Sequence, residues 1–358
     1  MLLISRSLTL GLAMLTVSSG CRDGEMLGMP DPDGPLGVLA RGRLAVYNGG
    51  VDRAAPAAPC QDDARHRQFD FWVGDWNVTA QNGATGATNQ IRAELDGCLV
   101  SENWTAANGI RGRSINAFDR DLGQWHQTWV SAQPGGHLRM AGGMEADTML
   151  LRGERITPSG FHWFDEYRWY VLPTGQVIQA WKFDSPSQNN HQQGALTYTR
   201  APSVTPRPET PTVACHPGGP AENARQLDFF HGEWTVAAEP GPALGTASIT
   251  SDLSGCLTEE NYRTDKGFAA TSFFYWDPVN RAWWRTYIDS EGARVELRGG
   301  LVDGSLVLTG TEPGPGGRSL RVRMTLEPVS AGVVRQEWAV SEDGEGWETE
   351  MALVFTRS

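Results

Sequence analysis

Hydrophobic and polar residues alternate with a period of two along many short segments of this chain. Residues 125–130 (WHQTWV), 305–309 (SLVLT), 320–326 (LRVRMTL) and 333–340 (VVRQEWAV) follow this pattern, which is typical of strands with one buried face. Turn sequences such as that at 173–175 (PTG) separate them. Many short strands with evenly spaced turns predict an antiparallel sandwich or an up-and-down barrel, and a closed barrel has no exposed strand edges.

The whole pattern occurs twice. Residues 69–78 (FDFWVGDWNV) correspond to residues 227–236 (LDFFHGEWTV), and Cys98 corresponds to Cys256 at the same offset of 158 residues. The offset then falls to 157 toward the end of each copy. Solenoid repeats are about 20–50 residues long, so this period indicates a duplicated domain. We predict one domain over residues 60–200 and a second over residues 215–358, each large enough to bury its own core.

The segments outside the two copies have different compositions. Residues 8–17 form an apolar stretch after Arg6 that is too short to span a bilayer, which needs about 20 residues. The SSGC sequence at 18–21 is similar to a bacterial lipobox, so we predict a signal peptide over 1–21 and a lipid on Cys21; ordinary signal cleavage is the alternative. We expect a disordered tether over 22–59 and an extended Pro-rich linker over 201–214.

Five cysteines in an exported protein leave one without a partner. Four of them allow three pairings, and the duplication favours Cys60–Cys98 and Cys215–Cys256, one disulfide in each copy. Each bond would close a loop of about 40 residues and stabilise its domain by roughly 3–4 kcal/mol. Cys21 then remains for the lipid. No clustered Cys and His residues have the spacing of a metal site, and we expect none.

A Gly-x-Trp motif begins each copy and an arginine ends it. The motif is GDW at 74–76 and GEW at 232–234, and the arginines are Arg200 and Arg357. With these features the chain resembles the calycin superfamily, and more narrowly a bacterial family of exported lipocalin-like domains without a settled function. The resemblance implies an all-β fold of two tandem lipocalin-like antiparallel β-barrels. It also implies that each arginine lies across the Trp face and seals the closed end.

Fourteen tryptophans, eight in the first copy and six in the second, suggest an aromatic interior. If the strands alternate, one face carries large rings and a few polar groups, as in small-molecule sites. The candidate lining residues are Trp104, Trp125, Gln127, Trp129, Gln179, Trp181, Tyr262, Trp283, Arg285, Tyr287, Gln336 and Trp338. An eight-stranded barrel can instead be packed solid. The leading hypothesis is a carrier of a small apolar or amphipathic molecule; solid barrels would favour an envelope module that contacts glycan or protein.

Glu102 and Glu260 occur at equivalent positions and are the weak candidates for a catalytic role. If Leu99 faces the core, strand alternation turns Glu102 outward, and we expect a surface ion pair. A bulge that reversed this direction would bury a carboxylate able to act as an acid, a base or a ligand anchor. Ser114 and Ser272 also recur, but no His or Asp recurs with them to form a triad. We therefore expect binding rather than catalysis.

Charge limits the partners. The net charge is −12, with residues 60–200 contributing 12 − 15 = −3 and residues 215–358 contributing 12 − 21 = −9. Neither copy has a basic stripe, which argues against nucleic acid. Some lipocalin-like bacterial barrels hold haem through one His, and His191 lies roughly at that place, but in a Gln- and Asn-rich loop we expect it to be solvated. We predict no cofactor, a monomer, and membrane contact only through a lipid on Cys21, in the bacterial cell envelope facing the periplasm or the outside.

Overall fold

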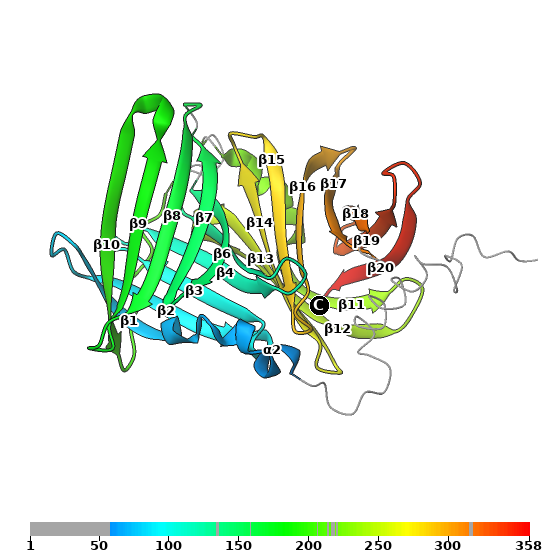
Figure 1. Cartoon of the computed structure of the whole chain (residues 1–358). Helices are drawn as coiled ribbons and strands as arrows, with labels where there is room; N and C mark the ends of the chain where they lie inside the picture. The colour runs from blue at the N-terminus through cyan, green and yellow to red at the C-terminus, as the bar shows by residue number, and fades with distance from the viewer. Residues whose placement is uncertain are drawn as a thin grey trace, which may run out of the picture.

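Two closed antiparallel barrels of ten strands each lie side by side in this protein (Figure 1). The computed structural model describes residues 58–358 except 134–135, 158, 206, 213–214, 216–218, 220 and 315–317. The predicted signal peptide, its lipid site Cys21 and nearly all of the predicted tether lie outside the described residues. The predicted fold class is confirmed, with ten strands in each barrel rather than eight.

Barrel 1 is a simple up-and-down meander in which each strand pairs with the next and β1 closes on β10. Its strands are β1 Gly74–Ala80, β2 Ala87–Glu94, β3 Leu99–Thr105, β4 Arg111–Asp119, β5 Gln124–Ser131, β6 His137–Glu145, β7 Thr148–Ile156, β8 His162–Val171, β9 Val177–Ser185 and β10 Asn190–Ala201. Short helices precede or connect them: α2 Pro59–Asp62, η1 Ala64–Arg67, η2 Asp70–Trp72, η3 Leu95–Gly97 and η4 Pro186–Gln188.

Barrel 2 repeats this topology, and β11 closes on β20. Its strands are β11 Gly232–Ala238, β12 Ala243–Asp252, β13 Leu257–Thr264, β14 Ala269–Asp277, β15 Ala282–Asp289, β16 Arg294–Val302, β17 Ser305–Pro313, β18 Ser319–Ser330, β19 Val333–Ser341 and β20 Glu348–Arg357, with η5 Glu222–Phe230 and η6 Leu253–Gly255. Among the described residues, no helix has the length and apolar character needed to cross a membrane.

The arginine of the last strand seals one end of each barrel, as the resemblance implied. The guanidinium carbon of Arg200 lies 4.5 Å from the ring centroid of Trp76, and Arg357 lies at the same distance from Trp234. Arg200 Nη1 also donates to Val73 O at 3.0 Å. Gly74 has a φ of +149°, and a Cβ there would collide with Nη1 of Arg200. The motif therefore needs glycine because the guanidinium occupies the space beside its Cα.

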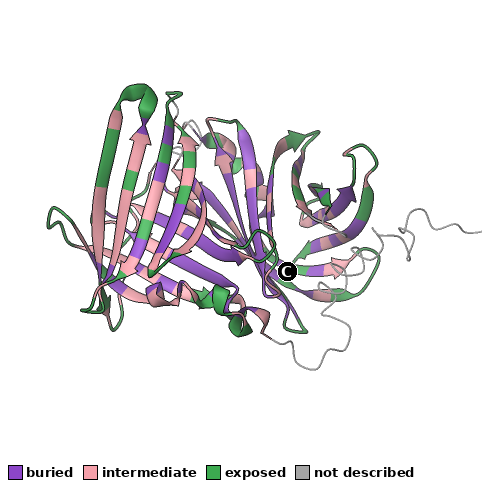
Figure 2. Cartoon of the chain, viewed as in Figure 1, coloured by how far each residue is buried: buried purple, intermediate pink, exposed green. Residues whose placement is uncertain are grey.

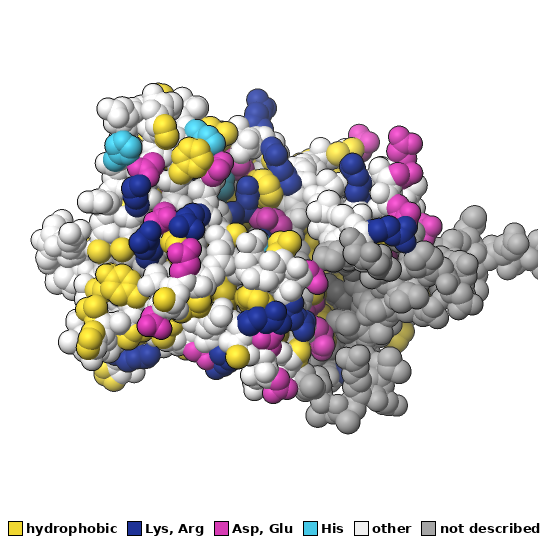
Figure 3. Space-filling view, in the orientation of Figure 1, with side chains coloured by type: hydrophobic (Ala, Val, Ile, Leu, Met, Phe, Trp, Pro, Cys, Tyr) yellow, Lys and Arg dark blue, Asp and Glu magenta, His cyan; other side chains and the backbone are white. Residues whose placement is uncertain are grey.

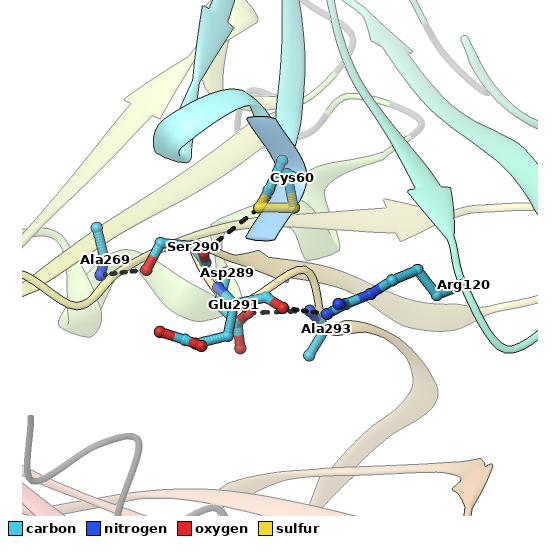
Figure 4. The surroundings of a disulfide bond; sticks show 8 residues. Cys60, Arg120, Ala269, Asp289, Ser290, Glu291 and Ala293 are labelled. Carbon is cyan, nitrogen blue, oxygen red and sulfur yellow. Dashed lines mark hydrogen bonds between the residues drawn. A yellow bond between two sulfur atoms is a disulfide. The ribbon is translucent and has the colours of Figure 1, made fainter. Parts of the chain in front are cut away.

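Both disulfides are present in the pairing that the duplication favours, Cys60–Cys98 and Cys215–Cys256. Each one joins the segment before the first strand of its barrel to the residue that follows the short helix after the second strand. The first also contacts the other barrel: Cys98 Sγ lies 3.4 Å from Ser290 O, in the β15–β16 turn (Figure 4). In the same turn the Asp289 carboxylate accepts hydrogen bonds from the backbone N–H groups of Glu291 and Ala293.

The two barrels pack through equivalent surfaces, which makes the interface pseudo-two-fold. The hydroxyl groups of Thr128 and Thr286, equivalent residues 158 positions apart, are 3.0 Å from each other. The equivalent pair Arg139 and Glu296 forms an ion pair at 3.2 Å. His137 Nε2 lies 3.2 Å from Asp277 Oδ2, and the equivalent residues Arg294 and Asp119 form an ion pair at 3.8 Å, so the symmetry relates these two contacts to one another. An isologous dimer has this arrangement.

An apolar layer fills the rest of this interface and explains which face of each strand is buried. Leu99, Ile115 and Val130 of barrel 1 form one cluster with Phe273 and Ile288 of barrel 2. These residues point outward from their own barrels. Consequently the outer as well as the inner faces of β14 and β15 are buried. The predicted linker over 201–214 also contacts barrel 1, because Thr210 Oγ1 donates a hydrogen bond to Asn108 O at 2.7 Å.

Candidate functional site

The interiors of the two barrels differ in how fully their side chains are buried. The predicted alternation of β5 is present, with Trp125, Gln127 and Trp129 facing inward. In barrel 1, four predicted lining residues are partly exposed: Trp104, Trp129, Gln179 and Trp181. Their counterparts in barrel 2 are buried to 5% exposure or less: Tyr262, Tyr287, Gln336 and Trp338. Figure 2 shows intermediate exposure along much of β9 and burial along β14 and β15.

Two predicted lining residues belong to the closed ends instead. Trp125 packs edge-on against Phe69, with ring centroids 5.6 Å apart, and donates from Nε1 to Gln68 Oε1 at 3.1 Å. Trp283 makes the equivalent bond to Gln226 Oε1 at 2.9 Å. Both indoles are 1% exposed. They anchor the helical turns that plug each barrel and lie in its core.

Two interior glycines let indoles lie flat against the wall of barrel 1. A Cβ at Gly112 would overlap the ring of Trp129, and a Cβ at Gly194 would overlap the ring of Trp181. A ring that covers a neighbouring glycine lies along the wall and does not extend across the lumen. In barrel 2 the equivalent positions hold Ala270 and Met351, both buried in the core. Barrel 1 therefore has less side-chain volume at two points where barrel 2 is filled.

A continuous chain of polar side chains crosses the interior of barrel 1. Gln127 Nε2 donates to Asn116 Oδ1 at 2.6 Å, and Asn116 Nδ2 donates to Ser114 Oγ at 3.0 Å. Ser114 Oγ donates to Glu102 Oε2 at 2.7 Å, and Asn89 Nδ2 donates to Glu102 Oε1 at 2.7 Å. These side chains are buried to 4% exposure or less. Four adjacent strands, β2 to β5, position them.

The centre of this network is Glu102, and the expectation that it forms a surface ion pair is wrong. Leu99 faces the other barrel, so alternation along β3 turns Glu102 into the lumen, with no bulge required. Burial raises the pKa of its carboxyl from 4.5 to about 7, although the hydrogen bonds from Asn89 and Ser114 act in the opposite direction. The group is therefore poised to change protonation near neutral pH. A buried carboxylate of this kind can hold a ligand or transfer a proton.

Barrel 2 holds the equivalent carboxylate in a different environment. Glu260 is also buried, but Arg285 Nη2 donates to its Oε2 at 2.8 Å, and both side chains are 5% exposed or less. Arg285 occupies the position that Gln127 occupies in barrel 1. Ser272, the counterpart of Ser114, accepts from Arg285 Nε at 3.2 Å. The negative charge of the Glu260 carboxylate is thus balanced by the Arg285 guanidinium of the same barrel.

Barrel 1 has further polar groups at positions that are apolar in barrel 2. Asp165 accepts from Arg155 Nε at 2.7 Å, and Tyr167 stacks on Trp169 with centroids 5.7 Å apart. Val322 and Met324 stand at the positions equivalent to Asp165 and Tyr167, as the pairing registers show. The lumen of barrel 1 is therefore lined by rings and polar groups, whereas that of barrel 2 is mainly apolar and closely packed.

The sequence motifs did not identify several members of this network. Asn89 and Asn116 lie on strands whose alternation was not assigned, and Tyr198 donates to Gln179 Oε1 at the end of the chain of polar groups. A signal was nevertheless present in the duplication. The counterparts of Asn89, Asn116 and Tyr198 are Ala247, Phe274 and Phe355. A position-by-position comparison of the copies shows polar residues in the first against apolar residues in the second.

Two chemistries that the sequence analysis set aside were haem binding and metal binding. His191, considered for haem, is exposed and its Nδ1 lies 2.6 Å from Asp184 Oδ1. Within the described ranges, no group of three or more His, Cys, Asp or Glu side chains is placed to hold a metal ion. On the face seen in Figure 3, acidic and basic side chains are interspersed.

Comparisons with known proteins give structural overlaps of low score. No family model matches the sequence, and no curated protein matches it. A candidate outer membrane protein from Bacteroides fragilis overlaps 81% of this chain and 99% of its own, with 9% identity and a TM-score of 0.20. A protein of unknown function from Nostoc punctiforme overlaps 83% and 100%, with 9% identity and a TM-score of 0.22. Isotype 1 transferrin binding protein B from serogroup B Neisseria meningitidis overlaps 73% and 66%, with 10% identity and a TM-score of 0.15. Scores this low carry no functional information.

Proposed function

We propose that this protein binds a small amphipathic molecule in the lumen of barrel 1, and that barrel 2 is a packed scaffold. The observation that carries the proposal is the contrast at equivalent positions. Trp129 and Trp181 are partly exposed beside glycines, whereas Tyr287 and Trp338 are buried in a filled core. Side chains that face inward and still reach solvent are typical of an open barrel, and one in this size range can hold one small ligand.

The chemistry of the lumen supports an amphipathic ligand. Trp181 stacks on Phe183 with ring centroids 4.5 Å apart, and Tyr167 contacts the same Phe183 ring at 5.5 Å in a tilted geometry. Such rings provide apolar contact area. The network around Glu102 lies deeper, with donors and acceptors for a polar group. A ligand with its polar group inward and its apolar part toward the mouth satisfies both surfaces.

We also propose that the protein is exported and lipid-anchored through Cys21. The disulfides support export, because disulfides persist in oxidising compartments such as the bacterial periplasm. The fifth cysteine follows an apolar leader and small residues. Mass spectrometry of the protein from a bacterial membrane fraction would test this: a diacylglyceryl group on Cys21 supports it, and an unmodified, soluble N-terminus contradicts it.

Native mass spectrometry of the full chain, followed by titration with the neutral fluorophore N-phenyl-1-naphthylamine, tests the binding proposal. We expect one fluorophore per chain. The Gly112→Ala, Gly194→Met double variant, which imports the residues of barrel 2, should lose binding. Gly143→Ala is the matched control, because a Cβ at Gly143 meets no atom within 4 Å. Binding that is absent in the wild type, or unchanged in the double variant, would contradict the proposal.

A second candidate, acid–base catalysis by Glu102, is favoured by its pKa of about 7 inside a shielded lumen. In that case the molecule bound in barrel 1 would be chemically changed during incubation with the wild type and unchanged with Glu102→Gln. Recovery of the same unchanged molecule from both proteins would support binding without catalysis.

A further inference from the structure

One side chain of barrel 2 lies where a ligand of barrel 1 would lie. The Arg285 guanidinium is 1% exposed and sits in the lumen between a carboxylate and three rings. Its carbon is 5.0 Å from the centroid of Phe274, 5.3 Å from that of Tyr287 and 5.0 Å from that of Trp338. A carboxylate together with aromatic faces is the usual surrounding of an organic cation in a protein.

Barrel 1 retains most of these surroundings but replaces the cation. Glu102 stands at the position of Glu260, and Trp129 and Trp181 stand at the positions of two of the three rings, as the strand registers show. The position of Arg285 is held by Gln127, whose amide is directed to Asn116. Within the described part of the chain, Glu102 is hydrogen-bonded by the neutral groups of Asn89 and Ser114.

The remaining groups of the lumen are also suited to a donor-rich ligand. Asn89 is fully buried, and its Oδ1 has no hydrogen-bond partner among the described residues. A buried carbonyl oxygen without a donor is costly unless a ligand or water satisfies it. Arg155, a basic side chain on the same barrel, is already paired with Asp165 at 2.7 Å. Among the described residues, the hydrogen bonds to the Glu102 carboxylate come from Asn89 and Ser114 and from no basic side chain.

We propose that the ligand of barrel 1 is an organic cation, an ammonium or guanidinium group on an apolar tail. The cationic group binds between Glu102, Trp129 and Trp181, where the Arg285 guanidinium lies in barrel 2. This inference rests on the proposed function above, and it adds the charge of the ligand. The second barrel thus carries its cation covalently, whereas the first takes it from solution.

Four octyl probes that differ only in their head groups test the charge: octylguanidinium, octylammonium, octanol and octanoate. Isothermal titration of the full chain at about pH 8 should show both cations binding at least about tenfold more tightly than octanol. Octanoate should be the weakest, because its carboxylate would meet that of Glu102. In the Glu102→Gln variant, the cations should lose their advantage while the affinity for octanol stays unchanged.

A second variant guards against a folding defect. Gln127→Arg copies barrel 2 and should place a guanidinium beside Glu102, so both octyl cations should lose binding while the protein gains thermal stability. Gln127→Met is the matched control and should retain the preference for cations. Two results would overturn the cation assignment: octanol binding as tightly as octylammonium, or equal losses of affinity for all probes in Glu102→Gln. Either result would still be compatible with a binding site in the lumen of barrel 1. If none of the four probes binds the wild type, the proposed function fails as well.

Discussion

The same substitution in the two barrels, Glu102→Gln and Glu260→Gln, should change stability in opposite directions. Among the described residues, the donors to the Glu102 carboxyl are neutral, and burial raises its pKa from 4.5 to about 7. The unfolded chain releases this proton near pH 4.5, whereas the folded chain holds it until about pH 7. In that window the folded state binds more protons, and the free energy of unfolding falls as the pH rises.

The size of the effect follows from this interval. The pKa rises from 4.5 in the unfolded chain to about 7 in the folded chain, and each pKa unit corresponds to about 1.4 kcal/mol. The ionised carboxylate therefore lowers the free energy of unfolding by about 3 kcal/mol at alkaline pH. Below pH 4.5 the group is protonated in both states and costs nothing. Burial also raises the pKa of the neighbouring Tyr167 and Tyr198 hydroxyls, which therefore stay neutral throughout. Glu102→Gln should remove the cost, so it should stabilise the protein by about 3 kcal/mol at about pH 8 and leave it unchanged at low pH.

Glu260→Gln is the matched control. It would leave the Arg285 guanidinium buried without its carboxylate, which costs about 3–5 kcal/mol. Urea unfolding of the oxidised full chain, followed by tryptophan fluorescence from about pH 5 to about pH 9, measures both variants. The reasoning is refuted if Glu102→Gln retains the wild-type loss of stability with rising pH, or if it destabilises the protein at about pH 8.

Three other features give predictions of known sign. Gly74→Ala should destabilise the protein by about 2–3 kcal/mol in urea, because its φ of +149° disfavours a side chain and the new Cβ displaces the sealing arginine; Gly143→Ala, in open space, should have little effect. The double variant Cys60→Ser, Cys98→Ser frees a loop with a sequence separation of 38 residues and should lose about 4 kcal/mol in the same assay. Arg139→Ala removes an interface ion pair and a guanidinium 3.3 Å from an indole centroid, so it should lower the thermal midpoint at a cost of about 1–2 kcal/mol; an unchanged midpoint would show that this contact contributes nothing.

The elements that repeat in both copies could be predicted from the sequence. The period of two predicted an antiparallel sandwich or barrel, and the internal symmetry favoured the disulfide pairing. The resemblance carried by the Gly-x-Trp motif and the final arginine implied the barrels and their seals. The direction of Glu102 could not be predicted from the sequence. Leu99 packs against the other barrel, whereas an apolar residue in a strand is normally expected to face the core of its own barrel. A strand that is buried on both faces gives no pattern from which its inner face can be read.

The pseudo-two-fold contact between the barrels bears on how the halves came to differ. Two identical chains joined across the same surface would carry every substitution twice, so an arginine that fills one lumen would fill both. Joining the copies in a single polypeptide removes that constraint while Thr128 still faces Thr286. One copy is then free to become solid and stiffen the pair, and the other can keep its interior accessible. Under the function proposed here, covalent linkage is what permits the two barrels to take different roles.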